Sequence, residues 1–263
     1  MRVAAAMVVR NERPYLGNCL RHLIDNGIDF YIIDNASTDE TRALLAADPF
    51  RRALIGVETY PFDGAFDWKG LVQVRERAAG RLDADWVLFV SADEMMHSYR
   101  AGERLCDAIA RIGREGWDAI DFNEFVFLPI ERDYAPDAQG FPDLRHYYFF
   151  EPHKPRLMRA RRADLPVSHV EAAGHFFAGE FKLAPETFAL RHYIVRNQDH
   201  AYRKYQERVF KADELSAGWH ANRHQQERTA FAFPDTRLLH RLGHPADRAL
   251  DRARPHDKHY WQW

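Results

Sequence analysis

Three groups of residues, rich in acidic and amide side chains, follow apolar segments in the first third of the sequence. They are Asn11 and Glu12 after AAAMVVR, Asp34 and Asn35 after FYII, and Ser91, Ala92, Asp93 and Glu94 after WVLFV. A carboxylate pair such as Asp93 and Glu94 can hold a divalent metal ion, which in turn can neutralise a diphosphate. The residue types therefore predict a metal-assisted site for a phosphate-bearing ligand.

Val3–Val9 and Phe30–Ile33 predict buried parallel strands, because they lack the alternation typical of a half-exposed strand. Two further strands are predicted over Ala53–Thr59 and Trp86–Val90. The predicted helices are one that begins near Pro14 and ends at Gly27, one over Thr38–Ala47 with Ser37 and Glu40 as a capping box, and one over Leu71–Leu82. This order predicts an α/β fold with a Rossmann-like, mostly parallel central sheet flanked by helices.

The carboxyl ends of the strands give the expected place of the site, because ligands of open α/β sheets bind in the crevice beyond those ends. The first turn, RNERP, contains no glycine, so the GxGxxG phosphate cradle is absent, and GxxxxGK[ST] occurs nowhere in the chain. Dinucleotide oxidoreductases and P-loop nucleotidases are therefore disfavoured. Without a glycine-rich cradle, a bound diphosphate would depend on a metal held by carboxylates.

Composition limits the partners and the compartment. The chain has 263 residues, a formal net charge of -2 and a pI near 6.7, which predict no general attraction to nucleic acid or to anionic lipid. Cys19 and Cys106 lack the spacing of a zinc or redox site, and the apolar N-terminal run is too short for a signal sequence or a membrane span. These features predict a cytoplasmic protein without a transmembrane segment.

The segments VVRNERPYLGNCLRHLIDNGIDFYIIDNASTDET and DADWVLFVSADEMM resemble the nucleotide-sugar half of a GT-A glycosyltransferase close to family 2. The similarity is strongest to the branch with NE, NxSTD and DWxxxxDxDE segments. Gly174–Phe177 (GHFF) and LRHYIVRNQDHAYRKY over Leu190–Tyr205 resemble later GH and HY…K segments of that branch. The resemblance implies metal-dependent sugar transfer from a nucleotide sugar, with inversion at the anomeric carbon.

The resemblance also implies roles for single residues, in a nucleotide-sugar pocket and in a metal site for Mn²⁺ or Mg²⁺. The pocket would comprise Asn11, Glu12, Asp34, Asn35, Ser91 and Ala92, with Arg75 or Arg77 on a donor phosphate. The metal ligands would be Asp93, Glu94 and His192. Ser91 departs from the family pattern, because a hydroxyl stands where the first aspartate of the DxD motif is usual.

Several of these residues also have purely structural interpretations. The alternatives are a turn at Asn11 and Glu12, a helix cap at Asp34 and Asn35, a solvated turn at Asp93 and Glu94, and an ordinary strand histidine at His192. The catalytic base stays open between Glu171 and His175 in HVEAAGHFF, with Glu180, Asp121 and Glu124 as further candidates.

The second half of the chain is expected to hold the acceptor. We predict a strand over Trp117–Leu128, a long loop over Asp133–Arg145, an aromatic cluster over Tyr147–Phe150 and a helix over Gln198–Ala217. The predicted domains are a GT-A domain over 1–215, divided into a nucleotide-sugar half (1–96) and an acceptor half (97–215), and a helical C-terminal extension over 216–263. This extension ends in HYWQW and could mediate a homodimer.

The resulting hypothesis is a glycosyltransferase of surface polysaccharide biosynthesis. It would use a UDP-, GDP- or dTDP-linked sugar and a glycan or lipid-linked acceptor, in the second case at the inner face of the membrane. Two alternatives stay open. The serine at Ser91 is compatible with an inactive or weakly active protein that binds nucleotide sugars, and a nucleotidyltransferase is less favoured because RNERP lacks a glycine-rich turn.

Overall fold

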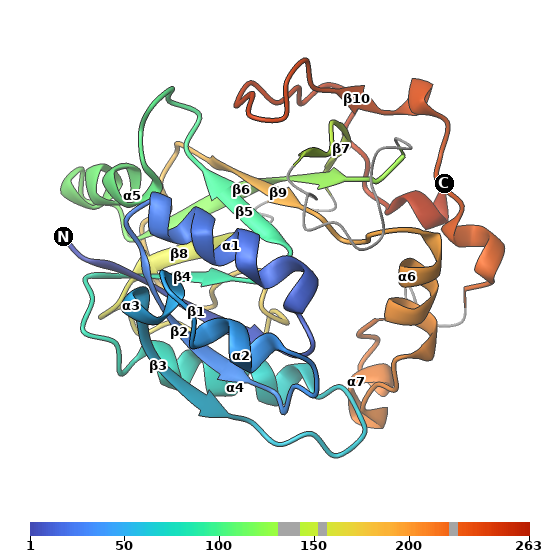
Figure 1. Cartoon of the computed structure of the whole chain (residues 1–263). Coiled ribbons are helices and arrows are strands. Elements are labelled where there is room, and N and C mark those ends of the chain that lie inside the picture. The colour runs from blue at the N-terminus through green and yellow to red at the C-terminus, as the bar shows by residue number, and fades with distance from the viewer. Residues whose placement is uncertain (131–142, 152–156, 221–225) are drawn as a thin grey trace.

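The computed structural model describes residues 1–130, 143–151, 157–220 and 226–263. Its centre is a mixed sheet in the strand order β10-β7-β6-β8-β4-β1-β2-β3, and β9 pairs with both β5 and β6 (Figure 1). The strands of its N-terminal half are β1 (Val3–Val9), β2 (Asp29–Asp34), β3 (Leu54–Thr59) and β4 (Trp86–Val90). These four strands pair in parallel, so the predicted Rossmann-like half is confirmed.

Helices cover both faces of this parallel half (Figure 1). The helices are α1 (Arg13–Asp25), α4 (Trp68–Ala79) and α5 (Leu105–Arg114). Ala5 and Met7 of β1 belong to the hydrophobic cluster formed with α1 and α5, whereas Ala6 belongs to the cluster that contains Ala79 of α4. Successive side chains of a strand point to opposite faces, so β1 is apolar throughout because both of its faces are covered.

The second half of the sheet is largely antiparallel, which corrects the expectation of a mostly parallel sheet. Its strands are β5 (Glu94–His97), β6 (Ala119–Phe127), β7 (His146–Phe150), β8 (Met158–Arg162) and β9 (Phe188–His192). β8 pairs antiparallel with β4 and β6, β7 with β6, and β5 with β9, while β6 and β9 are parallel. Antiparallel neighbours need no helical crossover between them, whereas helices join the parallel strands of the N-terminal half.

Two predicted helices are shorter than expected. Thr38–Ala47 contains only α2 (Thr41–Leu45), followed by α3 (Phe50–Ala53), and Glu40 makes no side-chain capping bond. Gln198–Ala217 divides into α6 (Gln198–Tyr202), a π-helix (Arg203–Glu207) and α7 (Ala212–Ser216). The break before α7 has a tertiary cause, because Phe210 bridges to Phe66 and the carbonyl of Val209 accepts a 2.7 Å bond from the amide of Phe66.

The described part of residues 216–263 does not form the expected C-terminal helices. It contains 3₁₀ turns at Arg228–Phe231, Thr236–Leu238 and Tyr260–Gln262, and the edge strand β10 (His240–Arg241). Trp261 is buried in a cluster that also holds Tyr148 of β7 and Tyr205 of the π-helix. The tail therefore supports the second half of the same chain, and the homodimer expected through it stays a prediction.

The aromatic residues Tyr147, Tyr148, Phe149 and Phe150 are buried in β7, so they serve the core rather than a sugar surface. The predicted long loop over Asp133–Arg145 lies for the most part outside the described residues. Among the described residues, no helix is both long and apolar enough to cross a membrane. Cys19 and Cys106 are free thiols, as expected.

Candidate active site

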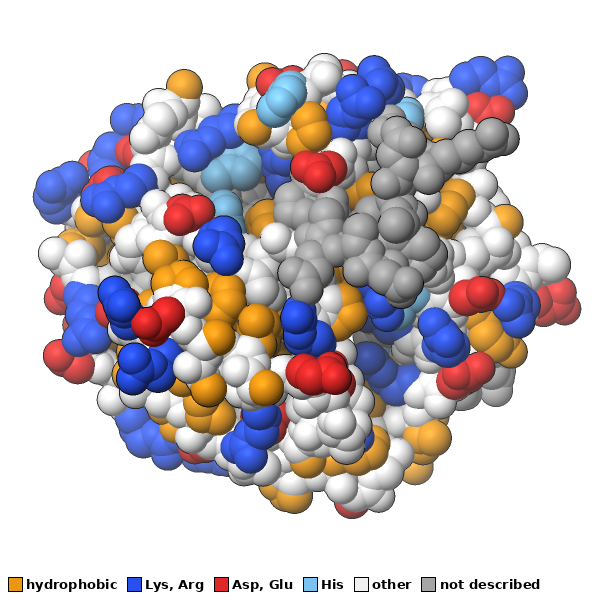
Figure 2. Space-filling view, in the orientation of Figure 1, with side chains coloured by type: hydrophobic (Ala, Val, Ile, Leu, Met, Phe, Trp, Pro, Cys, Tyr) orange, Lys and Arg blue, Asp and Glu red, His pale blue; other side chains and the backbone are white. Residues whose placement is uncertain are grey.

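A cavity of about 710 Å³ lies beyond the carboxyl ends of β1, β2 and β4. Residues 10–12 after β1, Asn35 after β2 and residues 91–94 after β4 form one wall, and residues from 196 to 209 form the opposite wall. The polar strand ends thus meet at one cavity, as the rule for open α/β sheets predicts. Figure 2 shows blue and red side chains intermixed over the face of the molecule seen in that view, without an extended patch of one sign.

The cavity itself is not balanced in charge. Seven Lys or Arg residues line it against four Asp or Glu residues. The basic residues are Arg10, Arg75, Arg159, Arg196, Arg203, Lys204 and Arg208, and the acidic ones are Glu12, Asp93, Glu94 and Glu207. Because the whole chain carries a net charge of -2, the positive excess is local to this site. Such an excess favours an anionic ligand.

Asn11 joins the turn after β1 to the NASTD segment. Its backbone has φ of 54°, a left-handed conformation that asparagine tolerates better than most residues. Its Oδ1 accepts a 2.7 Å hydrogen bond from the amide of Thr38, and its own amide donates to Oγ of Ser37 at 3.0 Å. Asn11 lines the cavity and at the same time fixes the loop beside it.

Asp34 and Asn35 at the end of β2 have different surroundings. Asp34 is 1% exposed and lies outside the cavity lining, where its carboxylate accepts a bond from the amide of Ser37 at 3.0 Å and pairs with Nε of Arg42 at 3.0 Å. Asn35 lines the cavity and donates to the carbonyl of Pro61 at 3.0 Å. The structure therefore places Asn35, rather than Asp34, at the surface that a ligand would touch.

Asp93 lies at the centre of a chain of alternating charges. Its Oδ2 is 2.8 Å from Nζ of Lys204 and 3.5 Å from Nε2 of His192, whose Nδ1 is 2.6 Å from Oε1 of Glu124. Burial raises the pKa of Asp93, but Lys204 and His192 outweigh burial and hold that pKa well below its usual range. Burial lowers the pKa of His192, but Asp93 and Glu124 raise it to about 10, so this imidazole is charged at neutral pH.

Glu94 has different partners from Asp93 although the two are neighbours in sequence. Its Oε1 is 2.7 Å from Nη2 of Arg159, and its Oε2 accepts a 2.8 Å bond from the amide of Ser91. Glu94 is 1% exposed, so both carboxylate oxygens are committed inside the protein. It closes the turn after β4 and leaves Ser91 and Ala92 on the cavity wall.

These contacts test whether the chain can hold the divalent metal that the resemblance implies. Asp93 and His192 offer two donor atoms, Glu94 is bound to Arg159, and Ser91 brings no charge. The ammonium of Lys204 lies on the same oxygen of Asp93 that a metal would use. Within the described ranges, no group of three Asp, Glu, His or Cys residues is placed to hold a metal. Divalent ions favour several oxygen ligands, so this donor set does not fit one.

Arg75 is the most deeply buried cation on the cavity wall. It is 2% exposed, and its Nε and Nη2 have no hydrogen-bond partner in the part of the chain that the structure describes. Its guanidinium lies 5.1 Å from the ring centre of Phe89, and burial and the nearby Arg159 lower its pKa to about 9. A buried guanidinium with free N–H groups at a cavity is suited to bind an anion. Arg77 is exposed and outside the cavity lining, because residues two apart face different sides of a helix.

His175 lines the cavity, whereas Glu171 is exposed and outside the lining. Between them the chain turns at Ala173 and Gly174, where the indole of Trp68 donates to the carbonyl of Ala173 at 2.7 Å. Gly174 has φ of 79°, and a Cβ there would lie 3.2 Å from Nη2 of Arg75. Glycine is therefore needed for the close approach of this turn to Arg75.

The remaining candidate bases have structural partners or distant positions. Asp121 accepts 2.9 Å bonds from the amides of Phe122 and Leu157, and Glu124 is bound to His192. Glu180 is exposed and outside the cavity lining.

Glu12 is half-buried on the cavity wall, and burial and the nearby Asp93 raise its pKa to about 7. It can therefore exchange a proton near neutral pH.

Sequence reasoning missed Lys204 and Arg159 as site residues. Lys204 lies within the HY…K segment, and Arg159 lies in a basic run over residues 156–162. Only Lys204 had a usable signal in the sequence. It is the lysine of the HY…K segment, and it could have been assigned to the site together with His192 of the same segment.

Comparison with known proteins gives one match to a family profile. Residues 5–119 match the sequence profile described as Glycosyl transferase family 2. No curated protein sequence matches the chain.

Three solved structures are similar to the chain at low identity. TarS 1-349 from S. aureus, in complex with UDP, is 15% identical over 76% of this chain and 62% of its own, with a TM-score of 0.44. Mannosyltransferase PcManGT from Pyrobaculum calidifontis, in complex with GDP-Man and Mn²⁺, is 13% identical over 78% and 61%, with a TM-score of 0.41. HddC from Yersinia pseudotuberculosis is 14% identical over 72% and 92%, with a TM-score of 0.37.

The chain spans less than two thirds of the length of the TarS and PcManGT chains. The family assignment therefore rests on the sequence match of the parallel half, where the polar strand ends lie. Residues 5–119 match this profile, so the resemblance is confirmed for the N-terminal part of the chain, which carries a Glycosyl transferase family 2 domain.

Proposed function

We propose that the chain transfers a sugar from a UDP-, GDP- or dTDP-linked donor to a glycan or lipid-linked acceptor, with inversion at the anomeric carbon. The observation that carries the proposal is the buried guanidinium of Arg75, which lines a cavity with an excess of cations. Its Nε and Nη2 have no hydrogen-bond partner among the described residues. A diphosphate supplies the anion that such a guanidinium binds.

In this proposal the nucleoside lies at the β1 and β2 side of the cavity. Arg10 is stacked 3.4 Å from the ring centre of Phe62, and both residues line the cavity next to Asn35. A flat cation on an aromatic ring offers a surface on which a base can stack, and Asn35 can bind polar groups of the nucleoside. The diphosphate then extends toward Arg75 and the strand end at Asp93.

The reaction breaks the bond between the anomeric carbon and the β-phosphate oxygen, which keeps the electron pair. The acceptor oxygen forms the new bond from the opposite face of the sugar and gives its proton to a base. Of the two predicted bases, we propose His175, because it lines the cavity and Glu171 does not. An imidazole within reach of the acceptor hydroxyl can take this proton near neutral pH.

No step of the proposed mechanism uses the divalent metal that the resemblance implies. PcManGT was solved with Mn²⁺, but the donor atoms of this chain do not fit such an ion. A role in surface polysaccharide synthesis at the cytoplasmic side of the membrane follows from the lipid-linked acceptor and is part of the proposal.

The proposal is tested by incubating the full chain with UDP-, GDP- and dTDP-linked sugars, with and without Mn²⁺. We expect one class to bind in calorimetry and to be hydrolysed slowly or transferred, and we expect Asp93→Asn to abolish turnover. Binding without any turnover would instead indicate an inactive nucleotide-sugar-binding protein. If no donor of the three classes binds under either condition, the proposed function is wrong.

A further inference from the structure

Lys204 occupies an unusual position for a lysine, because its ammonium is directed inward to the end of β4. Its Nζ donates to Oδ2 of Asp93 at 2.8 Å and to the carbonyl of Ile194 at 2.9 Å, and its side chain is only 17% exposed. An ammonium has three N–H donors, and these two are its hydrogen bonds to described residues. One donor therefore remains for a ligand in the cavity that Lys204 lines.

The backbone that carries Lys204 is a π-helix over Arg203–Glu207. Wide turns of this kind are rare and occur frequently at functional sites. The C-terminal tail packs against this turn, because the ring centres of Tyr205 and Trp261 are 4.8 Å apart. The tail thus supports the segment that presents Lys204 and Arg208 to the cavity.

Asp93 already has a cation as its partner without a metal. The ammonium of Lys204 lies 2.8 Å from its Oδ2. A divalent ion bound to Asp93 would lie close to the ammonium on the same oxygen, and like charges at such a distance repel. An incoming diphosphate adds negative charge, and Lys204, Arg75 and Arg208 are among the cations that line the cavity.

We propose that Lys204 takes the place of the divalent ion, so that the chain binds its donor diphosphate and transfers the sugar without a metal. This inference rests on the proposed function and adds to it the means by which the leaving group is neutralised. As the bond between sugar and phosphate breaks, the β-phosphate oxygen gains a negative charge, and Lys204 stabilises it through an N–H donor while keeping its own proton. The acceptor proton still goes to the base.

The direct test compares nucleotide binding by the wild-type chain in excess EDTA and in Mn²⁺, with UDP, GDP and dTDP as probes in isothermal titration calorimetry. We expect the dissociation constant of the preferred nucleotide to differ by less than about threefold between the two conditions. Binding that disappears in EDTA and returns with Mn²⁺ would overturn the inference while leaving the proposed function intact. Absence of binding in both conditions would overturn the proposed function instead.

Two substitutions test the residue itself. Lys204→Met is expected to weaken nucleotide binding in EDTA by about 10- to 100-fold, whereas Lys204→Arg keeps the charge and most of the affinity. Lys211→Met is the matched control, because Lys211 pairs with Asp63 outside the cavity lining and should leave binding unchanged. Unchanged affinity in folded Lys204→Met contradicts the inference, and if that variant does not fold, the EDTA comparison on the wild-type chain still decides.

Discussion

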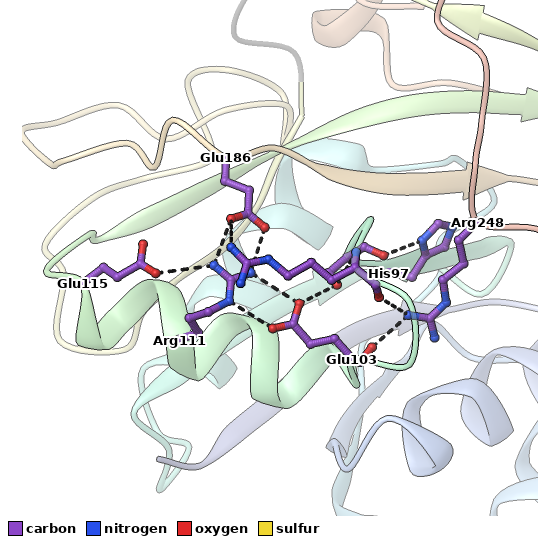
Figure 3. A network of polar contacts seen from close by, with 8 residues as sticks. His97, Glu103, Arg111, Glu115, Glu186 and Arg248 are labelled. Carbon is purple, nitrogen blue, oxygen red and sulfur yellow. Dashed lines mark hydrogen bonds and ion pairs between the residues drawn. The ribbon is translucent and has the colours of Figure 1, made fainter.

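Two arginines of this chain, Arg111 and Arg75, differ in the partners that surround them. Arg111 of α5 is held between carboxylates, with Nε 3.0 Å from Glu103 and Nη2 2.7 Å from Glu186 (Figure 3). Arg75 of α4 is buried more deeply, and among the described residues it forms no ion pair with a carboxylate and its Nε and Nη2 have no hydrogen-bond partner. Arg75 faces a cavity, whereas Arg111 is partly exposed and lies outside the cavity lining.

The difference indicates what each cation does. The contacts of Arg111 connect α5 to the segments before α5 and β9, and its hydrogen bonds with Glu103 and Glu186 raise its pKa above the usual value. A network with its partners in place stabilises the fold. A cation that is buried without hydrogen-bonded partners costs stability. We therefore expect an anionic ligand in the cavity to bind the Nε and Nη2 groups of Arg75, as proposed above.

The largest expected effect comes from removing the carboxylate at the centre of the cavity. Asp93→Asn leaves Lys204 and His192 without their shared partner, so transfer should fall by about 100-fold or more. The free energy of unfolding should fall by about 2 to 3 kcal/mol, because two buried charges lose an ion pair. Enzyme assays and urea unfolding measure the two quantities, and an Asp93→Asn enzyme with wild-type turnover would contradict the assigned site.

Substitution of Arg75 should weaken nucleotide binding without lowering the free energy of unfolding. Arg75→Met is expected to weaken nucleotide binding by about 10- to 100-fold, since a phosphate contact is lost. The free energy of unfolding should stay the same or rise by up to about 2 kcal/mol, because an uncompensated buried charge is replaced by an apolar side chain. Calorimetry and urea unfolding on one preparation test both. A less stable variant with unchanged affinity would show that Arg75 serves the fold.

Substitution of Arg111 should lower the free energy of unfolding without changing nucleotide binding. Arg111→Met is expected to lower the free energy of unfolding by about 1 to 3 kcal/mol, a range reduced for the partial exposure of Glu103 and Glu186. Nucleotide affinity should not change, because Arg111 is outside the cavity lining. If Arg111→Met instead weakened nucleotide binding without loss of stability, the contrast between the two arginines would fail.

The pH dependence of stability should differ between the two regions. At the cavity, burial and Asp93 raise the pKa of Glu12 from 4.5 to about 7, with Asp39 raising it slightly and Lys204 and Arg208 opposing. The folded state therefore binds more protons than the unfolded state between these two values. Stability falls as the pH rises through this window, by on the order of 1 to 2 kcal/mol after allowance for partial exposure.

Urea unfolding at about pH 5 and about pH 7.5 measures this change, and Glu12→Gln should remove it. Glu186 gives the contrast, because its hydrogen bond from Arg111 lowers its pKa. Its contribution is present above the ordinary pKa of 4.5 and is lost as the pH falls through its lowered value. A Glu12→Gln variant that keeps the wild-type difference between the two pH values would contradict the assignment to Glu12.

The smallest effect is expected at Arg77, two residues from Arg75 on the same helix. Arg77 is exposed and outside the cavity lining, so Arg77→Ala should change the free energy of unfolding by less than about 0.5 kcal/mol and leave nucleotide affinity unchanged. It serves as the control for Arg75→Met. A clear loss of affinity in this variant would place the phosphate on the outer side of α4.

The parallel half and its strand ends could be predicted from sequence because the signals are local. The predicted strands Val3–Val9, Phe30–Ile33 and Trp86–Val90 are uninterrupted apolar runs. The rule for open sheets places Asn11, Asn35 and Asp93 at one cavity. The partners of those residues could not be predicted. Lys204 is 111 positions from Asp93, so their contact depends on how the two halves of the chain pack.

Two further features depended on tertiary contacts. The helical pattern over 198–217 gives no sign of the π-helix or of the bridge from Phe210 to Phe66 that interrupts it. The pairing of Glu94 with Arg159 likewise spans 65 positions. Because of this pairing, the carboxylate that was predicted to bind a metal instead binds a guanidinium at the end of β4. Local propensity cannot weigh such distant partners.

The most direct test of the account is a crystal structure of the wild-type chain with its preferred nucleoside diphosphate in the presence of EDTA. We expect oxygens of the diphosphate to lie at hydrogen-bond distance, about 3 Å, from Arg75 and from Lys204, with Asp93 still paired to Lys204. A diphosphate bound away from both cations, or an ordered nucleotide only in crystals that contain Mn²⁺ on Asp93, would contradict it.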